Sequence, residues 1–142
     1  MQLSRFSDYS LRVLFYTATN NHRLCQLAEI ADFFDISVEH LRKVVHGLSK
    51  SGYLETFRGK KGGIRLAVPS SEINLGEIIA LTEGMRPFVD CTGQECCLSP
   101  ACGLKNILAQ AQAAMMRTLA QYSLEDILDD PQMQSRLIVT SR

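Results

Sequence analysis

The sequence predicts a mainly α-helical protein with one small β-hairpin and a long C-terminal helix. Three observations lead to this fold class. Apolar residues recur every three or four positions within the first 50 residues, as they do on the buried face of a helix. Two short stretches that alternate apolar and polar residues then flank a turn rich in glycine and lysine. After Gly103, neither proline nor glycine interrupts the chain up to Tyr122, which predicts a helix there.

The first half of the chain predicts three helices in succession. The apolar spacing indicates one helix over about residues 7–19 and a short one between Leu27 and Phe34. A three-residue break then ends in Ser37, whose hydroxyl is suited to cap the third helix. That helix has an apolar stripe, a polar and basic opposite face, and Gly52 as its stop signal. Helix, short helix, break and a helix with a basic outer face form the pattern of a helix-turn-helix.

A β-hairpin is predicted directly after this helix-turn-helix. Residues 53–58 and 64–67 alternate like strands, and the turn between them is Gly-Lys-Lys-Gly-Gly. A hairpin in this position is typical of the wing of a winged helix. A fourth short helix, ended by Gly84, completes a winged helix-turn-helix domain that we place at residues 1–84.

Charge is distributed unevenly along a chain whose formal net charge is zero. Residues 1–65 carry ten Lys or Arg against six Asp or Glu, whereas residues 66–142 carry five against nine. Seven of the basic residues lie between positions 38 and 65, beside only two acidic ones. This excess indicates either a solvated face or a surface for an anionic partner such as DNA. Its position on the third helix and the hairpin favours DNA.

The candidate DNA contacts lie on the third helix, at its start and outer face, and in the hairpin turn. They are Ser37, Glu39, His40, Arg42, Lys43, Lys50, Arg58, Lys60 and Lys61. We expect the basic side chains of the helix to contact phosphates and those of the turn to enter the minor groove. His40, Glu39 and Lys43 are placed to meet base edges in the major groove, where a carboxylate accepts from a cytosine amine.

The remaining composition indicates a cytoplasmic protein without a catalytic site. Of the 142 residues, 46% are hydrophobic, enough to bury a core. No apolar run approaches the roughly 18 residues of a membrane span, and the first residues lack the apolar stretch of a secretory signal. The three histidines lie near no plausible nucleophile in the sequence, so we expect neither an enzyme nor a membrane partner.

The second half of the chain is predicted to contain a loop, a long helix and a tail. Residues 85–102 hold four cysteines without helical periodicity, so we expect a cysteine-bearing loop. The long helix and a short last helix occupy residues 103–130, and residues 131–142 are expected to form a loose tail. A helix of about 20 residues spans about 30 Å. It is either a core helix of this domain or the dimerisation helix of a two-fold-symmetric protein.

Three cysteines of the loop, Cys91, Cys96 and Cys102, have a spacing that points to metal chemistry. In a cytosolic protein such a group favours metal binding over structural disulfides. Zinc sites use closely paired cysteines plus a second pair of Cys or His, and no histidine follows His46. The wider gaps favour an iron–sulphur cluster with one non-cysteine ligand, while a zinc module or buried free cysteines remain alternatives. Cys97 is interpreted as a bystander or an auxiliary thiol.

Several motifs together resemble a known family. They are Met1-Gln2-Leu3, Phe6-x-Asp8-Tyr9, Leu48-Ser49-x-x-Gly52-Tyr53, Arg58-Gly59-Lys60-x-Gly62-Gly63-Ile64-Arg65-Leu66 and the cysteine triad. Over about residues 1–128 the chain resembles the iron–sulphur winged-helix regulators of the IscR/NsrR family. The triad spacing, with Pro100-Ala101 before the last cysteine, looks most like the nitric-oxide-sensing members. IscR-type members carry a histidine at the position of Lys105, so the chain departs from them there.

The resemblance implies a homodimeric repressor with a cluster, 4Fe–4S in preference to 2Fe–2S, on Cys91, Cys96 and Cys102. The fourth ligand would be the partner subunit's Asp8, held by Arg12 one helical turn later, and an ordinary exposed Asp–Arg pair is the alternative. Nitric oxide would remove this ligand and release the protein from double-stranded operator DNA. Two alternatives stay open: a family regulator that senses iron, redox or cluster status, and an iron–sulphur electron carrier or assembly partner. The basic helix and hairpin argue against the second.

Overall fold

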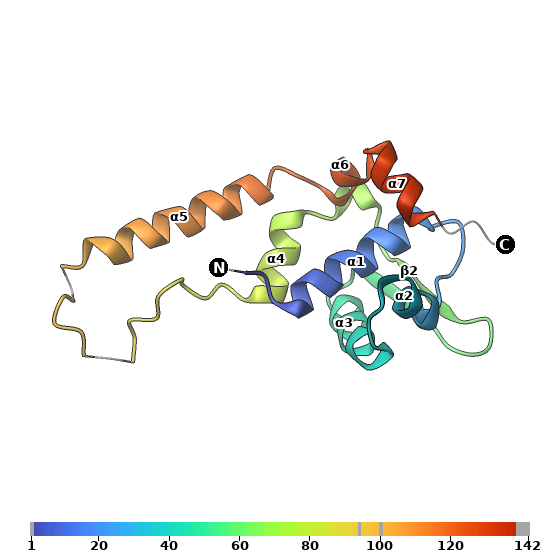
Figure 1. Cartoon of the computed structure of the whole chain (residues 1–142), viewed down its shortest axis with the longest axis horizontal. Helices are drawn as coiled ribbons and strands as arrows, with labels where there is room; N and C mark the ends of the chain where they lie inside the picture. The colour runs from blue at the N-terminus through green and yellow to red at the C-terminus, as the bar shows by residue number, and fades with distance from the viewer. Residues whose placement is uncertain (1, 94, 100, 139–142) are drawn as a thin grey trace.

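The computed structural model describes residues 2–93, 95–99 and 101–138. It shows a globular body from which one long helix, α5, extends (Figure 1). In chain order the elements are α1 (Arg5–Thr19), α2 (Leu27–Phe34), α3 (Val38–Lys50), β1 (Leu54–Phe57), β2 (Gly63–Leu66), the 3-10 helix η1 (Ser70–Glu72), α4 (Leu75–Glu83), α5 (Gly103–Leu119), α6 (Leu124–Leu128) and α7 (Pro131–Leu137). The predicted fold class, mainly α-helical with one β-hairpin, is confirmed.

Local sequence signals set the ends of the helix-turn-helix. The Ser37 hydroxyl accepts a hydrogen bond from the backbone N–H of His40 and caps α3, as predicted. Asp35, between α2 and α3, has a left-handed backbone (φ 53°), a conformation that aspartate tolerates better than most residues. Gly52 follows α3 with φ 84° and ends it, also as predicted. The direction of α3 is therefore fixed by short-range chemistry at both ends.

The core lies where α1, α2 and α3 meet. Leu14, Ile30, Leu41 and Leu48 are fully buried there, each from the apolar stripe of its helix. Full burial of such a side chain contributes about 1.5–3 kcal/mol, so the stripes hold α3 with its polar face outwards. Leu124 of α6 is buried in the same cluster, which closes the core from the C-terminal side.

The hairpin is attached to this core by a third stretch of chain. Strands β1 and β2 pair antiparallel, with Leu54 opposite Leu66. Cys25 and Ile64 exchange two backbone hydrogen bonds of 2.9 and 2.8 Å, so the segment before α2 pairs with β2. A Cβ atom on Gly63 would lie 2.7 Å from the Cys25 carbonyl oxygen, and only glycine permits this approach.

The long helix is shorter and more exposed than the sequence predicts. α5 ends at Leu119 rather than near Tyr122, and none of its residues, all of which the structure describes, is buried. Its attachment to the body is at the C-terminal end, where the Asn74 side-chain amide donates to the Ala120 carbonyl at 2.8 Å. The alternative of an internal core helix is therefore wrong for the single chain. The placement of segment boundaries after residues 84, 102 and 130 stays a prediction.

The prediction of a loose tail is wrong for its first part, which is helical. Residues 131–137 form α7, which begins with Asp130 as its cap and Pro131 in the first turn. Leu137 is buried, and its carbonyl accepts a hydrogen bond of 3.2 Å from the buried Asn20 side chain at the end of α1. This burial ties α7 to α1 and could not be deduced from the local sequence alone. Residues 139–142 of the expected tail lie outside the described residues.

Candidate functional site

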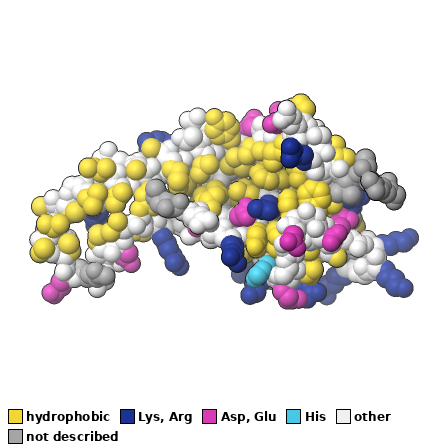
Figure 2. All heavy atoms as spheres, viewed as in Figure 1, with side chains coloured by type: hydrophobic (Ala, Val, Ile, Leu, Met, Phe, Trp, Pro, Cys, Tyr) yellow, Lys and Arg dark blue, Asp and Glu magenta, His cyan; other side chains and the backbone are white. Residues whose placement is uncertain are grey.

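The outer face of α3 presents the predicted DNA-contacting side chains to solvent. Glu39, His40, Arg42, Lys43 and Lys50 are all exposed, and the buried residues of the helix lie on its other face. Figure 2 shows Lys and Arg side chains along the lower edge of the globular body, where Figure 1 places α3 and the hairpin. The structure thus brings the predicted basic residues of helix and hairpin to one region.

Two of these residues are engaged with each other. Arg42 Nη1 donates to Glu39 Oε1 at 2.8 Å, although both side chains are largely exposed. Such a pair on one helix contributes only about 0.2–0.5 kcal/mol, so contacts with DNA can replace it at little cost. His40 is also held, since its Nδ1 lies 2.9 Å from the Ser37 hydroxyl. Base contacts by Glu39 and His40 stay a prediction.

The turn of the hairpin carries the other candidate contacts. Arg58, Lys60 and Lys61 are exposed there between β1 and β2. A Cβ atom on Gly62 would lie 2.2 Å from the Phe57 carbonyl oxygen, so the tight turn requires this glycine. Arg65, which is not among the predicted DNA contacts, has its guanidinium carbon 4.9 Å from the centre of the Phe57 ring. It also donates from Nε to Glu55 at 2.7 Å, which stiffens the base of the turn.

The cysteine loop connects α4 to α5. Cys96 and Cys97 are exposed, Cys91 and Cys102 are half-buried, and all four are free thiols. Cys102 is the N-cap residue of α5, where the positive end of the helix dipole favours negative charge. Three accessible sulphur donors suit an iron–sulphur cluster in their chemistry. Gln94 and Pro100 of this loop lie outside the described residues.

The predicted ligands do not come together within one protomer. Among residues 2–93, 95–99 and 101–138, no group of three or more His, Cys, Asp or Glu side chains is placed to hold a metal ion. Asp8 lies on α1, where Arg12 Nε donates to its Oδ1 at 3.0 Å. The expected Asp8–Arg12 pair is therefore present, with the side chains 45% and 40% exposed and reachable from outside. Whether Asp8 binds a cluster is untested by this geometry and stays a prediction.

The structure also contains a polar cluster that the sequence did not reveal. The Glu83 carboxylate, at the end of α4, accepts hydrogen bonds from the Ser4 backbone N–H at 2.6 Å and from the Ser7 hydroxyl. The Ser7 hydroxyl lies 2.7 Å from the Thr82 hydroxyl as well. The bond from Ser7 lowers the pKa of Glu83, with a smaller contribution from Ser4. Residues so far apart in sequence give no local signal of such pairing.

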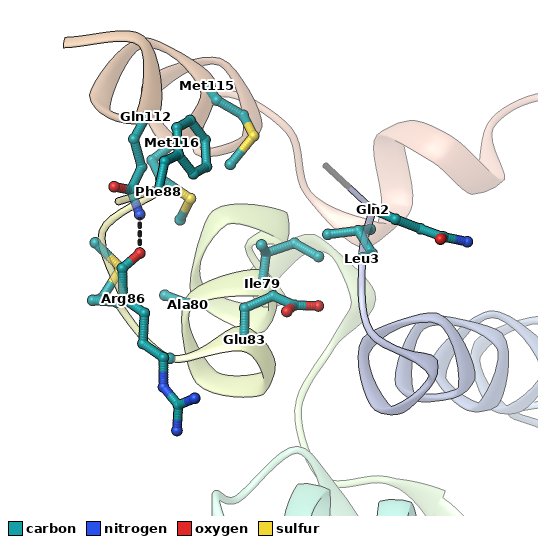
Figure 3. A pocket seen from close by; sticks show the side chains of 12 residues that line it. Gln2, Leu3, Ile79, Ala80, Glu83, Arg86, Phe88, Gln112, Met115 and Met116 are labelled. Atoms are coloured by element: carbon teal, nitrogen blue, oxygen red, sulfur yellow. Dashed lines mark hydrogen bonds between the residues drawn. The ribbon is translucent and has the colours of Figure 1, made fainter. Parts of the chain in front are cut away.

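A second unpredicted feature is an apolar groove of about 420 Å³ between the N-terminal segment, α4 and α5. Leu3, Ile79, Phe88, Met115 and Met116 are among the side chains that line it (Figure 3). The Gln112 side chain donates to the Arg86 carbonyl at 2.6 Å and closes one side of the groove. The groove thus borders the root of the cysteine loop.

Comparison with proteins of known sequence places the chain among transcriptional regulators. A protein named HTH-type transcriptional regulator NsrR from Bacillus licheniformis is 47% identical over 132 residues, covering 90% of this chain and 92% of its own length. The protein of the same name from Bacillus subtilis is 38% identical over 142 residues, covering 97% of both chains.

Solved structures agree with the fold. The global cysteine regulator CymR of B. subtilis has a TM-score of 0.75 at 25% identity, covering 91% of this chain and 97% of its own. IscR of T. potens has a TM-score of 0.74 at 24% identity, covering 92% of this chain and 88% of its own, and supports the fold alone. The described helices include none that is both long enough and apolar enough to cross a membrane.

The family itself follows from a match that spans nearly the whole chain. The model of the Rrf2 family, described as an iron-dependent transcriptional regulator, matches residues 3–130. This match covers the helix-turn-helix, the hairpin, the cysteine loop and α5. The prediction of a DNA-binding transcription regulator rather than an enzyme is thereby confirmed. The chain belongs to the Rrf2 family of transcriptional regulators.

Proposed function

We propose that the protein is a homodimeric, cytoplasmic repressor that senses nitric oxide through an iron–sulphur cluster. The observation that carries this proposal is the triad Cys91, Cys96 and Cys102, three free thiols in one loop of a DNA-binding regulator. Relatives named NsrR at 38–47% identity support it further. The fourth ligand is the partner subunit's Asp8, a half-buried carboxylate that Arg12 orients in each chain.

The exposed face of α5 supports the homodimer. Leu104 and Ile107 are 61% and 63% exposed, and Met115 is 39% exposed. Figure 2 shows hydrophobic side chains along the part of the molecule that Figure 1 identifies as α5. Apolar side chains at these spacings gain free energy when a second helix removes them from water, at about 25 cal/mol per Å². A second copy of α5 is the simplest cover, because closed two-fold pairing is the most common assembly.

In the dimer, the residues of this chain link cluster binding to DNA binding. When bound, the cluster would supply an iron atom held by a carboxylate, which is a harder and weaker ligand than thiolate and is open to displacement by a diatomic gas. Cys91, Cys96 and Cys102 would bind the cluster from the loop of one protomer, and the partner's Asp8 would bind it from α1. The cluster would thus connect the loop of one protomer to α1 of the other. This anchoring keeps the two α3 helices at the spacing of a palindromic operator. Release of Asp8 allows other dimer geometries, and repression is lost by a shift in population.

On this proposal the DNA contacts are those of α3 and the hairpin. Ser37, Glu39, His40, Arg42, Lys43 and Lys50 meet the major groove and its phosphates, and Arg58, Lys60 and Lys61 enter the minor groove. A 4Fe–4S cluster is proposed in preference to 2Fe–2S. A regulator of the same family that senses iron or redox state is the second candidate, favoured by the family description as iron-dependent.

The test is an anaerobic purification followed by visible absorption and DNA-binding measurements. We expect a coloured protein that binds its operator, and stoichiometric nitric oxide should abolish this binding. Cys91→Ser should remove both colour and tight binding, whereas Cys97→Ser, at an exposed thiol outside the triad, is the matched control and should keep both. A colourless zinc protein, or operator binding that nitric oxide leaves unchanged, would reject the proposal.

A further inference from the structure

The Ser37 hydroxyl is shared between two nitrogen atoms of His40. It accepts a hydrogen bond from the His40 backbone N–H at 3.3 Å, and it lies 2.9 Å from Nδ1 of the same residue's ring. A serine hydroxyl carries one proton and can accept as well as donate. Because the backbone N–H occupies a lone pair of the oxygen, the hydroxyl proton remains free for the contact with Nδ1. The His40 ring and the cap of α3 therefore form one hydrogen-bonded unit.

This arrangement favours one tautomer of the His40 ring. A neutral imidazole has one nitrogen that donates and one that accepts, and the hydrogen bond of one nitrogen determines where the ring proton lies. When Nδ1 accepts from Ser37, the ring proton lies on Nε2. With the proton on Nδ1, the hydroxyl would accept from two donors and its own proton would be left to solvent. A hydroxyl that accepts one bond and donates another is polarised so that both bonds strengthen. The contact with Ser37 thus favours a ring whose Nε2–H is a donor.

The His40 ring also has an aromatic neighbour. Its centroid lies 6.1 Å from that of the Tyr9 ring, with the planes inclined by 42°, a separation at which two aromatic rings attract each other. Tyr9 is partly buried against the core, so it is a fixed neighbour. His40 itself is exposed in the first turn of α3. Since Nδ1 is engaged by Ser37, Nε2 is the ring nitrogen available to a ligand.

We propose that His40 recognises a guanine in the major groove by donating a hydrogen bond from Nε2, and that Ser37 is the positioning residue that keeps the proton there. The proposal rests on the proposed function, since it takes α3 as the helix that enters the major groove. Side chains at the N-terminal end of such a helix contact base edges.

The four bases differ in what they offer to this donor. In the major groove cytosine presents only a donor, adenine presents a donor beside its acceptor, and thymine presents one acceptor beside a methyl group. Guanine presents two adjacent acceptors, N7 and O6. An N–H donor is therefore satisfied best by guanine and is opposed most directly by cytosine.

The first test measures base preference on a duplex that the parent protein selects from a random DNA library. Each G·C pair of a half-site is reversed in turn, and a wrong base pair commonly lowers affinity about 5- to 150-fold. At one guanine this penalty should disappear in His40→Asn, whose amide reaches only the position of Nδ1. His40→Gln places an amide N–H near the position of Nε2 and should retain part of the penalty. His46→Asn, at an exposed histidine later in α3, is the matched control and should keep it in full. A His40→Asn protein that keeps every penalty would overturn the proposal.

The variant Ser37→Asp separates the position of the ring proton from the capping of α3. Aspartate caps a helix as well as serine does, but an ionised carboxylate only accepts, so it favours the proton on Nδ1 and leaves Nε2 as an acceptor. Measurements at about pH 8.5 keep the histidine ring neutral. We expect the preference for guanine over cytosine at this pair to fall at least about fivefold, with unchanged far-ultraviolet circular dichroism. Preference is compared in place of affinity, because an added negative charge weakens binding to all DNA. Ser37→Thr keeps a hydroxyl and should keep the preference. A Ser37→Asp protein with the parent preference would overturn the proposal.

A second measurement needs no DNA. Nitrogen-15 nuclear magnetic resonance of the full-length protein distinguishes a protonated from an unprotonated ring nitrogen, and the exposed His22 and His46 are internal references. We expect His40 to carry its proton on Nε2 in the parent protein and to shift towards Nδ1–H in Ser37→Asp. A parent His40 with the proton on Nδ1 would overturn the inference. A parent protein that binds its selected duplex equally well after nitric oxide treatment would instead defeat the proposed function, and the two failures are therefore distinguishable.

Discussion

The Glu83 carboxylate accepts a hydrogen bond from the Ser7 hydroxyl, which fastens the last residue of α4 to the first turn of α1. The same carboxylate accepts from the Ser4 backbone N–H at 2.6 Å and thereby serves the N-terminus of α1. The cysteine loop begins two residues after Glu83, and Asp8 follows Ser7. The root of the loop and the helix that carries the proposed ligand Asp8 are therefore held together within the chain.

Removal of this link should lower the stability of the protein. Glu83→Ala leaves the Ser4 N–H without its acceptor and leaves the Ser7 hydroxyl with Thr82 as its remaining acceptor. Removal of one partner of a buried hydrogen bond typically costs about 1–3 kcal/mol. Chemical denaturation of the cluster-free protein measures the loss. Glu72→Gln, at an exposed carboxylate in η1, is the control and should change stability by less than about 0.5 kcal/mol. A double-mutant cycle with Ser7→Ala should show strong non-additivity, and additive losses would contradict a direct link.

The stability of the protein should depend on pH through the ionisation of the same carboxylate, Glu83. The hydrogen bond from Ser7 holds the pKa of Glu83 below its usual value of 4.5, so the folded state binds the proton less readily than the unfolded state. This stabilisation is complete above the unfolded pKa and is lost as the pH falls through the lower, folded pKa. The parent protein should be more stable to unfolding than Glu83→Gln at about pH 6, and this difference in free energy of unfolding should shrink as the pH falls below about 4.5. A stability difference that stays constant over this range would contradict the assignment.

The hairpin turn should contribute to DNA binding mainly through charge. Lys60→Ala and Lys61→Ala should each weaken binding across all DNA sequences and reduce the slope of log affinity against log salt by about 0.9. Both side chains are exposed in the turn. Lys105→Ala, an exposed lysine on α5 away from the hairpin, is the matched control and should leave the slope unchanged. Equal salt slopes in all three variants would show that the turn does not contact DNA.

The apolar face of α5 should determine the oligomeric state. Ile107→Glu places a charge among the exposed apolar side chains of the proposed interface, and burial of an unpaired charge is unfavourable. We expect a monomer in light scattering at concentrations where the parent protein is a dimer. Asn106→Glu is the control, because residue 106 lies about 200° around the helix from Leu104. The Asn106→Glu protein should remain dimeric. A dimeric Ile107→Glu protein would show that α5 is not the interface.

The sequence by itself determined the elements whose signals are local. Ser37, Gly52 and the glycine turn at 59–63 predicted the ends of α3 and the hairpin, because caps and tight turns depend on a few adjacent residues. The cysteine spacing is also a local signal, because donor chemistry is a property of residue type, and the kind of site that it indicates stays a prediction. The ion pair between Asp8 and Arg12 is predictable from sequence, because residues four apart on a helix face one another.

Only the tertiary structure decided the contacts that join distant parts of the chain. Glu83 with Ser7, Arg12 with Phe34 and the burial of Leu137 in α7 all depend on how helices pack. No local pattern encodes such pairings, because the same apolar stripe can pack in several orientations until the whole core is assembled. Sequence therefore determined which basic and sulphur-bearing side chains the protein offers, and packing determined which side chains contact one another.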